Sequence, residues 1–296
     1  GHAPPVVTGM VAGDSGAVVL RTTRGLVFGD LSDGPFRLQC LDASALLPSE
    51  TETLCIAGDR VEVASVTGLV EMATDGCGVD RPAAFDGVPT TDVQQRDDGS
   101  LLLLTTGAGL ANDAWSKPVG GSWQPRGFAL EQELYSALRP FASAELATGV
   151  RLDAATGRPV HFVREIAGLT VTSELTIDPG PDGYRVHLLD VRNGPAPEAL
   201  VLVDQYAEST TEDRVLRYRP GGEVEELVAA GEIVDARFGP DGAIYAASSQ
   251  GLLRRDAAGG IATVGDGRGA TMVGVVDGTV FSATEYSVDG LSLIHI

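Results

Sequence analysis

Short runs in which apolar and polar residues alternate recur along the chain, and each run follows a turn that contains Asp, usually with Gly nearby. The segment Arg60–Ala64 alternates with a period of two, and Ala17–Leu20 is the apolar run at the matching place after its turn. That period is typical of a β-strand, since an amphipathic helix repeats every 3.6 residues. Asp-Gly turns accept the positive φ of two-residue hairpins. The pattern therefore predicts strands joined by tight hairpins.

Five of these segments align as an internal repeat. Each has a turn aspartate, then a strand-like run, then Ser or Thr, and four of the five continue with Gly-Leu. The turn aspartates are Asp14, Asp59, Asp98, Asp241 and Asp277, with spacings of 45, 39, 143 and 36 residues. The glycines of the Gly-Leu pairs are Gly25, Gly68, Gly109 and Gly251, with spacings of 43, 41 and 142 residues. Both markers indicate the same period, and the long gap holds a little over three repeats.

Four short strands and three turns need about forty residues, which is the size of one propeller blade. The sequence therefore predicts an all-β fold, a β-propeller of four-stranded blades that forms a single domain over residues 4–290. Seven blades, the last one ending after two strands, is the simplest arrangement, with six or eight blades as alternatives. The expected blades span residues 4–48, 49–90, 91–128, 129–178, 179–230, 231–267 and, in part, 268–290.

Two stretches in the middle of the chain fit the repeat less clearly. Residues 129–147 include the run ALEQELYSAL, which also suits a helix, but Pro140 and the position in the repeat favour strands. Residues 164–183 are surplus to the repeat, and we expect a long outer strand with an inserted turn at 179–183.

The two ends of the chain carry patterns of another kind. Gly1–Ala3 has the small-x-small form of a signal-peptidase site, which favours a secreted or periplasmic protein made with a signal peptide. Residues 291–296 read like a translated sequencing adapter, so we set them aside as an artefact and expect the natural chain to continue past Gly290. A genuine terminal strand is the alternative. No apolar run reaches the roughly 18–20 residues of a membrane span.

The charge of the chain bears on its partners. There are 41 acidic and 21 basic residues, for a net charge of −20. Such a chain repels phosphate backbones and anionic lipid, which argues against binding to nucleic acid or to a membrane surface. It favours a basic partner or a cation over an anion. The expected partner is a protein or a glycan, and we expect the complete protein to be a monomer.

A second turn follows the Gly-Leu pair, and its residues resemble the Asp-box, or BNR repeat, whose usual form is Ser-x-Asp-x-Gly-x-Thr-Trp. The resemblance implies that Asp33 and Asp75 cap backbone amides between the third and fourth strands of a blade. It also implies that Phe36 and Trp123 pack within their blades. The copies are degenerate, because the third lacks the Asp. The motif implies a propeller similar to those of the sortilin- and sialidase-like superfamily, and it says little about activity. The three turns are residues 31–36, 73–77 and 118–123.

The three cysteines are too few for a disulfide framework and lack the C-x-x-C spacing of a metal site. Cys40 lies in the expected outer strand of the first blade and Cys77 at the matching turn of the second. A disulfide between Cys40 and Cys77 is therefore favoured if the protein is secreted. Three reduced thiols are the alternative. Cys55 lies among apolar residues and is expected to be a buried free thiol.

The sequence predicts no catalytic residue, no cofactor and no metal site. Gly13–Gly16 copies the nucleophile loop of trypsin-like proteases, but it aligns with a plain turn of the other repeats and lacks His and Asp partners. His161 and His187 are isolated on expected strands, which argues against a His-based metal site. A sialidase-like site needs three arginines and a Tyr/Glu pair, and no spacing singles out a tyrosine. The tyrosines considered are Tyr206, Tyr218, Tyr245 and Tyr286.

These features together favour a non-catalytic extracellular or periplasmic propeller that acts as a rigid binding scaffold for a protein or glycan ligand. Loops on such a scaffold carry recognition, while the strands carry stability. The alternative is a carbohydrate-active hydrolase, sialidase- or endoglucanase-like, with carboxylates in the central channel. Most glycoside hydrolases use a pair of such carboxylates.

Overall fold

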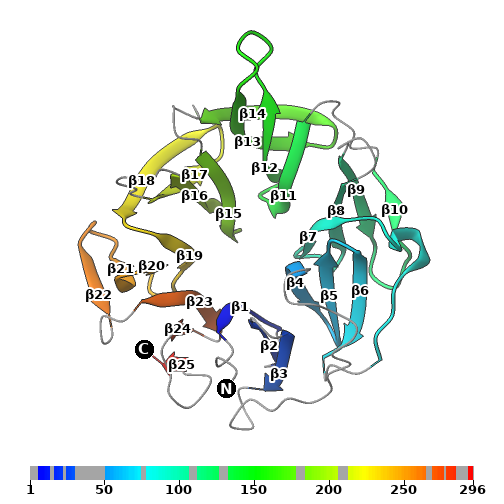
Figure 1. The fold of residues 1–296 in the computed structure, drawn as a ribbon, viewed down its shortest axis with the longest axis horizontal. Coiled ribbons are helices and arrows are strands. Elements are labelled where there is room, and N and C mark those ends of the chain that lie inside the picture. Colours follow the sequence, from blue (N-terminus) through cyan, green and yellow to red (C-terminus); the bar gives the residue numbers. More distant parts are fainter. Residues whose placement is uncertain are drawn as a thin grey trace.

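Antiparallel sheets arranged around a central opening make up the described part of the chain (Figure 1). There are seven sheets, four with four strands and three with three. The first strand of each sheet lies nearest the opening and the later strands lie progressively further out (Figure 1). This is the all-β propeller that the repeat predicts. The computed structural model describes residues 6–13, 17–22, 25–30, 51–74, 78–106, 112–126, 133–177, 184–205, 213–264, 269–276, 278–284 and 293–295.

The strands follow one another outward within each sheet, in the order of the sequence. The three-stranded sheets are β1 (Val7–Ala12), β2 (Ala17–Thr22) and β3 (Gly25–Asp30); β4 (Thr51–Ala57), β5 (Arg60–Ser65) and β6 (Gly68–Ala73); and β23 (Ala270–Val276), β24 (Thr279–Thr284) and β25 (Leu293–His295). The first two four-stranded sheets are β7 (Thr90–Gln95), β8 (Leu101–Thr106), β9 (Asn112–Lys117) and β10 (Gln124–Pro125); and β11 (Glu133–Phe141), β12 (Ala144–Leu152), β13 (Pro159–Ala167) and β14 (Thr170–Ile177). The other two are β15 (Tyr184–Arg192), β16 (Glu198–Gln205), β17 (Asp213–Arg219) and β18 (Glu223–Ala230); and β19 (Ile233–Phe238), β20 (Ile244–Ser248), β21 (Gly251–Arg255) and β22 (Ile261–Val264).

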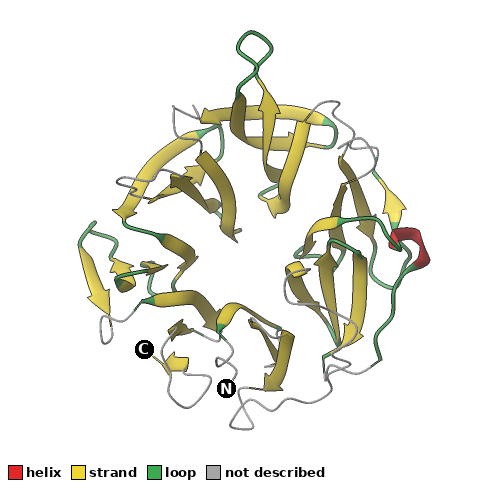
Figure 2. Cartoon of the chain, in the orientation of Figure 1, coloured by secondary structure: helices red, strands yellow, loops and turns green. Residues whose placement is uncertain are grey.

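Helix is nearly absent. The helix in the described residues is a single 3-10 turn, η2 (Ala83–Phe85), drawn red in Figure 2. No helix among those residues is long and apolar enough to cross a membrane.

The Ser/Thr and Gly-Leu marker of the repeat has a structural cause. The Ser65 hydroxyl, at the end of β5, donates a hydrogen bond of 2.6 Å to the carbonyl of Gly68, which begins β6. Gly68 has a φ of 129°, which an L side chain rarely adopts, and a Cβ there would lie 2.2 Å from the Phe85 carbonyl oxygen. The marker therefore closes the hairpin between the second and third strands. The same bond joins Thr22 to Gly25 at 2.7 Å and Ser248 to Gly251 at 2.8 Å.

A β-bulge in the first strand is repeated in every sheet. In each case the pairing with the second strand skips one residue, as between Leu188 and Asp190 in β15 and between Ile233 and Asp235 in β19. A bulge sharpens the local twist and redirects the side chains beside it. Its repetition gives every inner strand the same shape next to the channel. The other bulges lie at 7–9, 51–53, 90–92, 135–137 and 270–272.

The apolar core is divided into layers that lie between neighbouring sheets. One layer packs Leu200 and Val215 of one sheet against Phe238 of the next. The first and last sheets pack together in the same way, with Met10 and Met272 in one buried cluster. The Thr271 hydroxyl also donates a 2.7 Å hydrogen bond to the carbonyl of Val7. Contacts between β1 and β23 therefore close the ring.

The prediction that the run ALEQELYSAL belongs to a strand and not to a helix is confirmed for the residues that the structure describes. Residues 133–141 form β11, which pairs with β12 along its length and includes Pro140. The expectation of one long outer strand over 164–183 is wrong. The chain turns at Gly168, which has a φ of 63°, and residues 170–177 return as β14. Residues 178–183 lie outside the described part.

The last sheet also differs from the sequence expectation. Leu293–His295 forms β25 and pairs with β24, so this sheet has three strands where two were expected. The segment that was set aside at 291–296 thus contributes backbone pairing to the sheet, as the alternative of a terminal strand implies. Its likeness to a sequencing adapter and the number of blades both stay predictions.

Candidate functional site

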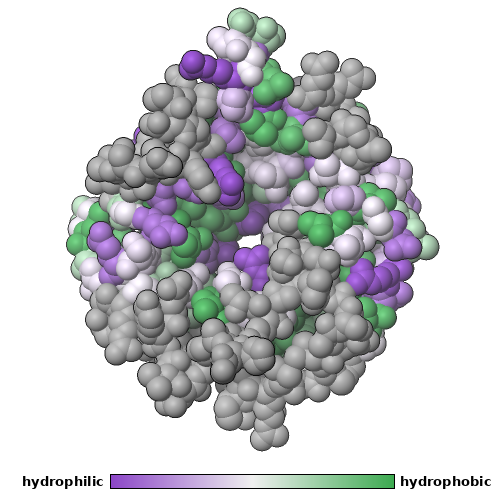
Figure 3. All heavy atoms as spheres, in the orientation of Figure 1, coloured by the Kyte–Doolittle hydropathy of each residue, from purple (hydrophilic) through white to green (hydrophobic). Residues whose placement is uncertain are grey.

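A cavity of about 1010 Å³ lies at the centre of the ring. Hydrophilic residues border the central opening on the face shown in Figure 3. No Phe, Tyr or Trp is among the described residues that line the cavity, so its walls are polar and aliphatic. The polar lining side chains are those of Thr8, Arg21, Thr53, Gln94, Gln95, Asp97, Arg139, His187, Asp190, Asn193, Asp204, Asp213, Glu232, Asp235 and Arg237.

Aspartates beside the bulges tie neighbouring sheets together. Asp235 Oδ2 accepts a 3.0 Å hydrogen bond from the backbone N–H of Val273 in the next sheet. Asp92 Oδ2 accepts one from Leu138 at 3.0 Å. A hydrogen bond from a buried amide to a charged acceptor stabilises the folded protein more than one to a neutral acceptor. The carboxylates therefore hold the inner strands in fixed positions. The other bonds of this kind run from Phe238 N to Asp190 Oδ2 at 2.9 Å and from Val93 N to Thr53 Oγ1 at 3.0 Å.

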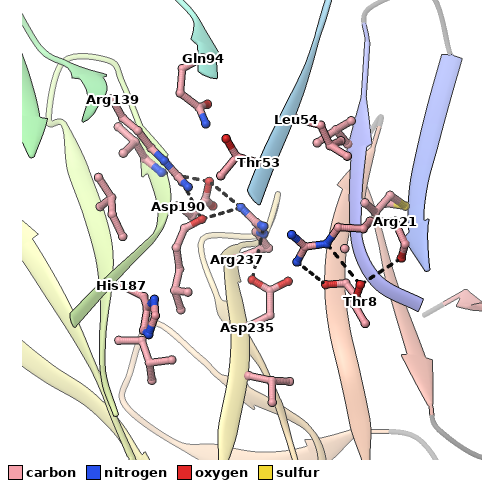
Figure 4. Close-up of a pocket in the computed structure, with 18 of the residues that line it drawn as sticks. Thr8, Arg21, Thr53, Leu54, Gln94, Arg139, His187, Asp190, Asp235 and Arg237 are labelled. Carbon is pink, nitrogen blue, oxygen red and sulfur yellow. Dashed lines mark hydrogen bonds and ion pairs between the residues drawn. The ribbon is translucent and has the colours of Figure 1, made fainter. Parts of the chain in front are cut away.

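Two guanidinium groups converge on one backbone oxygen in the cavity (Figure 4). Arg139 Nη1 of β11 donates to the Leu189 carbonyl at 2.9 Å, and Arg237 Nη1 of β19 donates to it at 2.6 Å. Leu189 is the residue that the bulge in β15 leaves unpaired. The bulge thus presents a carbonyl that links the sheets on either side.

Aspartates near Arg237 balance its positive charge, at distances longer than that of its hydrogen bond to Leu189. Arg237 Nη2 lies 3.4 Å from Asp235 Oδ1, and Arg237 Nη1 lies 3.8 Å from Asp190 Oδ1. Burial raises the pKa of Asp235, while the charge of Arg237 opposes that rise. Burial acts against the charge of Arg237, but Asp235 and Asp190 outweigh it, so the pKa of Arg237 is raised. Arg237 is therefore a cation at neutral pH.

Another group of ionisable side chains lines the cavity near His187. Burial lowers the pKa of His187, the charge of Asp204 opposes that effect, and the charge of Arg185 adds to it. Burial and the nearby carboxylate of Asp213 raise the pKa of Asp204. Asp213 Oδ2 accepts a 2.7 Å hydrogen bond from Ile233 N. Asp213 thus connects β17 to β19.

A polar cluster outside the cavity joins the sheet of β4–β6 to that of β7–β10. Glu62 and Glu71 face each other across β5 and β6, and Lys117 Nζ lies 3.5 Å from Glu62 Oε1 and 2.9 Å from Glu71 Oε1. Lys117 is the only lysine of the chain. Burial, and next the charge of Glu71, raise the pKa of Glu62 to about 7. Glu62 is therefore partly protonated at neutral pH.

The turn aspartates that the structure describes lie in turns. Asp98 Oδ1 accepts hydrogen bonds from Ser100 N at 2.9 Å and from Ser100 Oγ at 2.6 Å. Asp241 Oδ1 accepts one from Ala243 N at 3.1 Å. The carbonyl of Asp59 accepts a 3.0 Å hydrogen bond from Thr74 N. The other sequence-selected residues lie outside the described residues: Asp14, Asp33, Asp75, Asp277, Cys40 and Cys77.

Trp123 and Cys55 are also among the residues that the sequence singled out, while Phe36 lies outside the described residues. The turn at 118–123 joins β9 to β10, and the Trp123 ring stands edge-on to Phe85 at 5.6 Å. Trp123 Nε1 also donates to Glu71 of β6 at 3.3 Å, so the side chain packs between two sheets, whereas the resemblance implies packing within its own blade. The Asp-box identity stays a prediction. Cys55 is a buried free thiol, and burial raises its pKa. No group of three or more His, Cys, Asp and Glu in the described residues is placed to hold a metal ion.

Of the tyrosines considered for a sialidase-like site, the two that the structure describes, Tyr218 and Tyr245, do not line the cavity. Tyr218 donates to Glu165 at 3.0 Å and Tyr245 to Asp241 at 3.3 Å, both within or between sheets. Tyr206 and Tyr286 lie outside the described residues.

Sequence reasoning missed the cavity residues, although a local signal was present. Asp235-Ala236-Arg237 places a carboxylate and a guanidinium two positions apart, and alternate residues of a strand share a face. Asp190-Val191-Arg192 repeats the pattern 45 residues earlier, at the same period as the turns. Of these four charged residues Asp190, Asp235 and Arg237 line the cavity and Arg192 does not, so the pattern marks only part of the lining.

Comparison with known proteins identifies a fold. No protein-family model matches the chain, and no curated protein matches it. The extracellular domain of BT4673 from B. thetaiotaomicron is 13% identical with a TM-score of 0.60, and the alignment covers 99% of this chain and 38% of that one. Virginiamycin B lyase from Staphylococcus aureus is 12% identical with a TM-score of 0.61, covering 96% of this chain and 92% of that one. An ancestral GH74 enzyme is 10% identical with a TM-score of 0.51, covering 98% and 53%. At these identities the similarity establishes the β-propeller fold alone.

Proposed function

We propose that the protein is a non-catalytic extracellular or periplasmic β-propeller that binds a protein or glycan ligand at its central cavity. The observation that carries this proposal is the cavity of about 1010 Å³, because a site of this size accepts a small ligand or the tip of a larger one. The fold is shared with the extracellular domain of BT4673, which supports a location outside the cytoplasm.

The architecture of the cavity supports binding by a rigid site. Arg139 and Arg237 are both held by the Leu189 carbonyl, and Asp235 is held by the Val273 amide. Side chains fixed before the ligand arrives lose little conformational freedom on binding, which favours affinity. The scaffold therefore presents its polar groups in one arrangement.

The proposal includes the organisation of the whole chain. Residues 4–290 form one domain of seven blades, and β25 (Leu293–His295) adds a strand to the last blade from beyond that range. In the secreted protein, Cys40 and Cys77 form a disulfide between the first two blades. Mass determination before and after alkylation under non-reducing conditions tests the disulfide: a bridge leaves one thiol of the three to react.

A carbohydrate-active hydrolase is the second candidate, and the carboxylates of the cavity favour it. Asp190 and Asp235 both line the cavity, and the pKa of Asp235 is raised, as a general acid requires. However, one oxygen of each is already bonded to a backbone amide of the next sheet. That bonding supports a structural role for both, so the hydrolase ranks below the binding scaffold.

Two assays on the full chain separate these functions. The protein is applied to an array of neutral and acidic glycans and, separately, incubated with a panel of chromogenic glycosides. A binding scaffold retains glycans or an extracellular protein partner and releases no chromophore. Turnover that Asp235→Asn abolishes, with the fold intact by circular dichroism, establishes the hydrolase instead.

A further inference from the structure

The arginine and aspartate groups of the cavity are close but incompletely bonded to one another. The separations of 3.4 Å between Arg237 and Asp235 and 3.8 Å between Arg237 and Asp190 exceed the roughly 2.7–2.9 Å of a charge-assisted hydrogen bond. Arg139 Nε lies 3.6 Å from Asp92 Oδ2, and it is buried without a hydrogen bond among the described residues. These donors and acceptors are therefore near enough for one small polar group to contact both.

Each of these groups also keeps unused hydrogen-bonding capacity. A guanidinium has five N–H donors, and each carboxylate oxygen accepts at two lone pairs. Among the described residues, Arg237 donates a hydrogen bond to Leu189 and forms longer ion pairs with Asp235 and Asp190. The side chain of Arg237 is 28% exposed and that of Asp190 is 25% exposed, and both line the cavity. The remaining capacity is thus open to a ligand.

The charges in this part of the cavity select the ligand class. Asp92 pairs with Arg139 but does not line the cavity, and both of its oxygens already accept hydrogen bonds. Arg139 and Arg237 carry two positive charges in the cavity, and Asp190 and Asp235 line it beside Arg237. A carboxylate or phosphate would meet these aspartates, and an ammonium group would meet the arginines. A neutral hydroxyl both accepts and donates, so it bonds a guanidinium and a carboxylate at once. A molecule with several adjacent hydroxyls can form such a pair of hydrogen bonds more than once.

We propose that the cavity binds a neutral polyhydroxylic ligand, a saccharide without carboxylate or amino groups, across Arg237, Asp190 and Asp235, with Arg139 as a further donor (Figure 4). This inference rests on the proposed binding function and names the ligand class of the same site. Since no aromatic ring lines the cavity in the described residues, directed hydrogen bonds carry the recognition in place of ring stacking.

Isothermal titration with defined sugars tests this inference. The neutral probes are cellobiose, maltose and xylobiose, and the charged probes are glucuronic acid, N-acetylneuraminic acid and glucosamine. We expect at least one neutral probe to bind, and each charged probe to bind at least about tenfold more weakly, as for the loss of a hydrogen bond to a charged group. A charged probe that binds as tightly as the best neutral probe overturns the inference.

Arginine variants locate the site. Arg237→Met keeps an unbranched side chain but removes the donors, and Arg237→Lys keeps the charge but loses the planar group. We expect both to weaken the binding of the neutral probe about tenfold or more. Arg254→Met is the matched control, because Arg254 pairs with Asp241 on the exterior and does not line the cavity. Unchanged binding in the folded Arg237→Lys variant overturns the placement of the ligand.

The outcomes distinguish this inference from the function on which it rests. If no neutral probe binds but the protein still captures a protein ligand or an acidic glycan, the inference fails and the binding scaffold stands. If neither the sugars, the glycan array nor a protein partner binds, both fail.

Discussion

Arg139 and Arg237 donate to the same oxygen, the Leu189 carbonyl, from the sheets on either side of the strand that carries it. The carbonyl is available because a β-bulge removes Leu189 from the pairing of β15 with β16. One backbone irregularity therefore connects three sheets and fixes two of the cavity's cations. The stability of the ring and the shape of its cavity depend on the same contacts.

Replacing Arg139 by Met should destabilise the protein by about 2 kcal/mol, because the hydrogen bond from the guanidinium to the Leu189 carbonyl and the ion pair with buried Asp92 are both lost. Denaturant unfolding at pH 7 measures the change. Arg254→Met, an exterior arginine, should change stability by no more than about 0.5 kcal/mol. Equal effects of the two substitutions would contradict the structural role of Arg139.

Asp92 accepts hydrogen bonds at both carboxylate oxygens, from Gln94 Nε2 at 2.9 Å and from Leu138 N at 3.0 Å. In Asp92→Asn one of these donors faces an NH₂ group, so we expect a loss of about 1–3 kcal/mol in the free energy of unfolding. Asp97→Asn, at an exposed position, is the matched control. A stability of Asp92→Asn equal to that of the control would show that the link between the sheets is dispensable.

Alanine substitutions at Gly68 and Gly58 test whether the hairpin between β5 and β6 requires a glycine at Gly68. Both have positive φ, of 129° and 64°, but a Cβ at Gly68 meets the Phe85 carbonyl at 2.2 Å while at Gly58 it meets nothing within 4 Å. Gly58→Ala should cost about 1 kcal/mol, the typical strain of a left-handed residue, and Gly68→Ala distinctly more. Thermal unfolding of both variants tests the order, and the reverse order would refute the close approach.

Glu62 should make stability depend on pH. Its pKa is about 7 in the folded protein against an ordinary value of 4.5, so the folded state binds more protons between these values. The free energy of unfolding therefore falls as pH rises from 4.5 through 7, by about 3 kcal/mol from this group. Below pH 4.5 both states hold the proton and the contribution is complete.

The substitution Glu62→Gln removes this titration and should raise stability relative to wild type at pH 8, with a smaller difference at pH 5. Glu226→Gln, at a half-exposed position, should leave the pH profile unchanged. Unfolding curves recorded between pH 4.5 and 8 supply the comparison. A profile of Glu62→Gln parallel to that of wild type would count against burial of Glu62 beside Glu71.

The repeat could be identified from the sequence because its markers are local. Ser65 bonds Gly68 three residues away, and the same spacing recurs at Thr22 and Ser248, so each hairpin carries its own signature. The hairpin of β13 and β14 was missed because its turn at Gly168 has no aspartate and interrupts a run of strand-forming residues.

The cavity could not be assembled from the sequence, because its contacts join distant residues. Arg139 and Arg237 meet at Leu189, about 50 residues from each. Which of the 41 acidic residues face the channel depends on the bulges, since a one-residue shift moves a side chain to the other face. A bulge leaves no clear mark in the alternation of residues.

Hydrogen–deuterium exchange with and without a bound ligand tests the central claim most directly. The wild-type protein is labelled alone and with the tightest-binding glycan or protein from the screens. Binding in the channel predicts slower exchange in peptides covering the inner strands β15 (Tyr184–Arg192) and β19 (Ile233–Phe238). Slower exchange confined to the outer strands β14 (Thr170–Ile177), β18 (Glu223–Ala230) and β22 (Ile261–Val264) would contradict it.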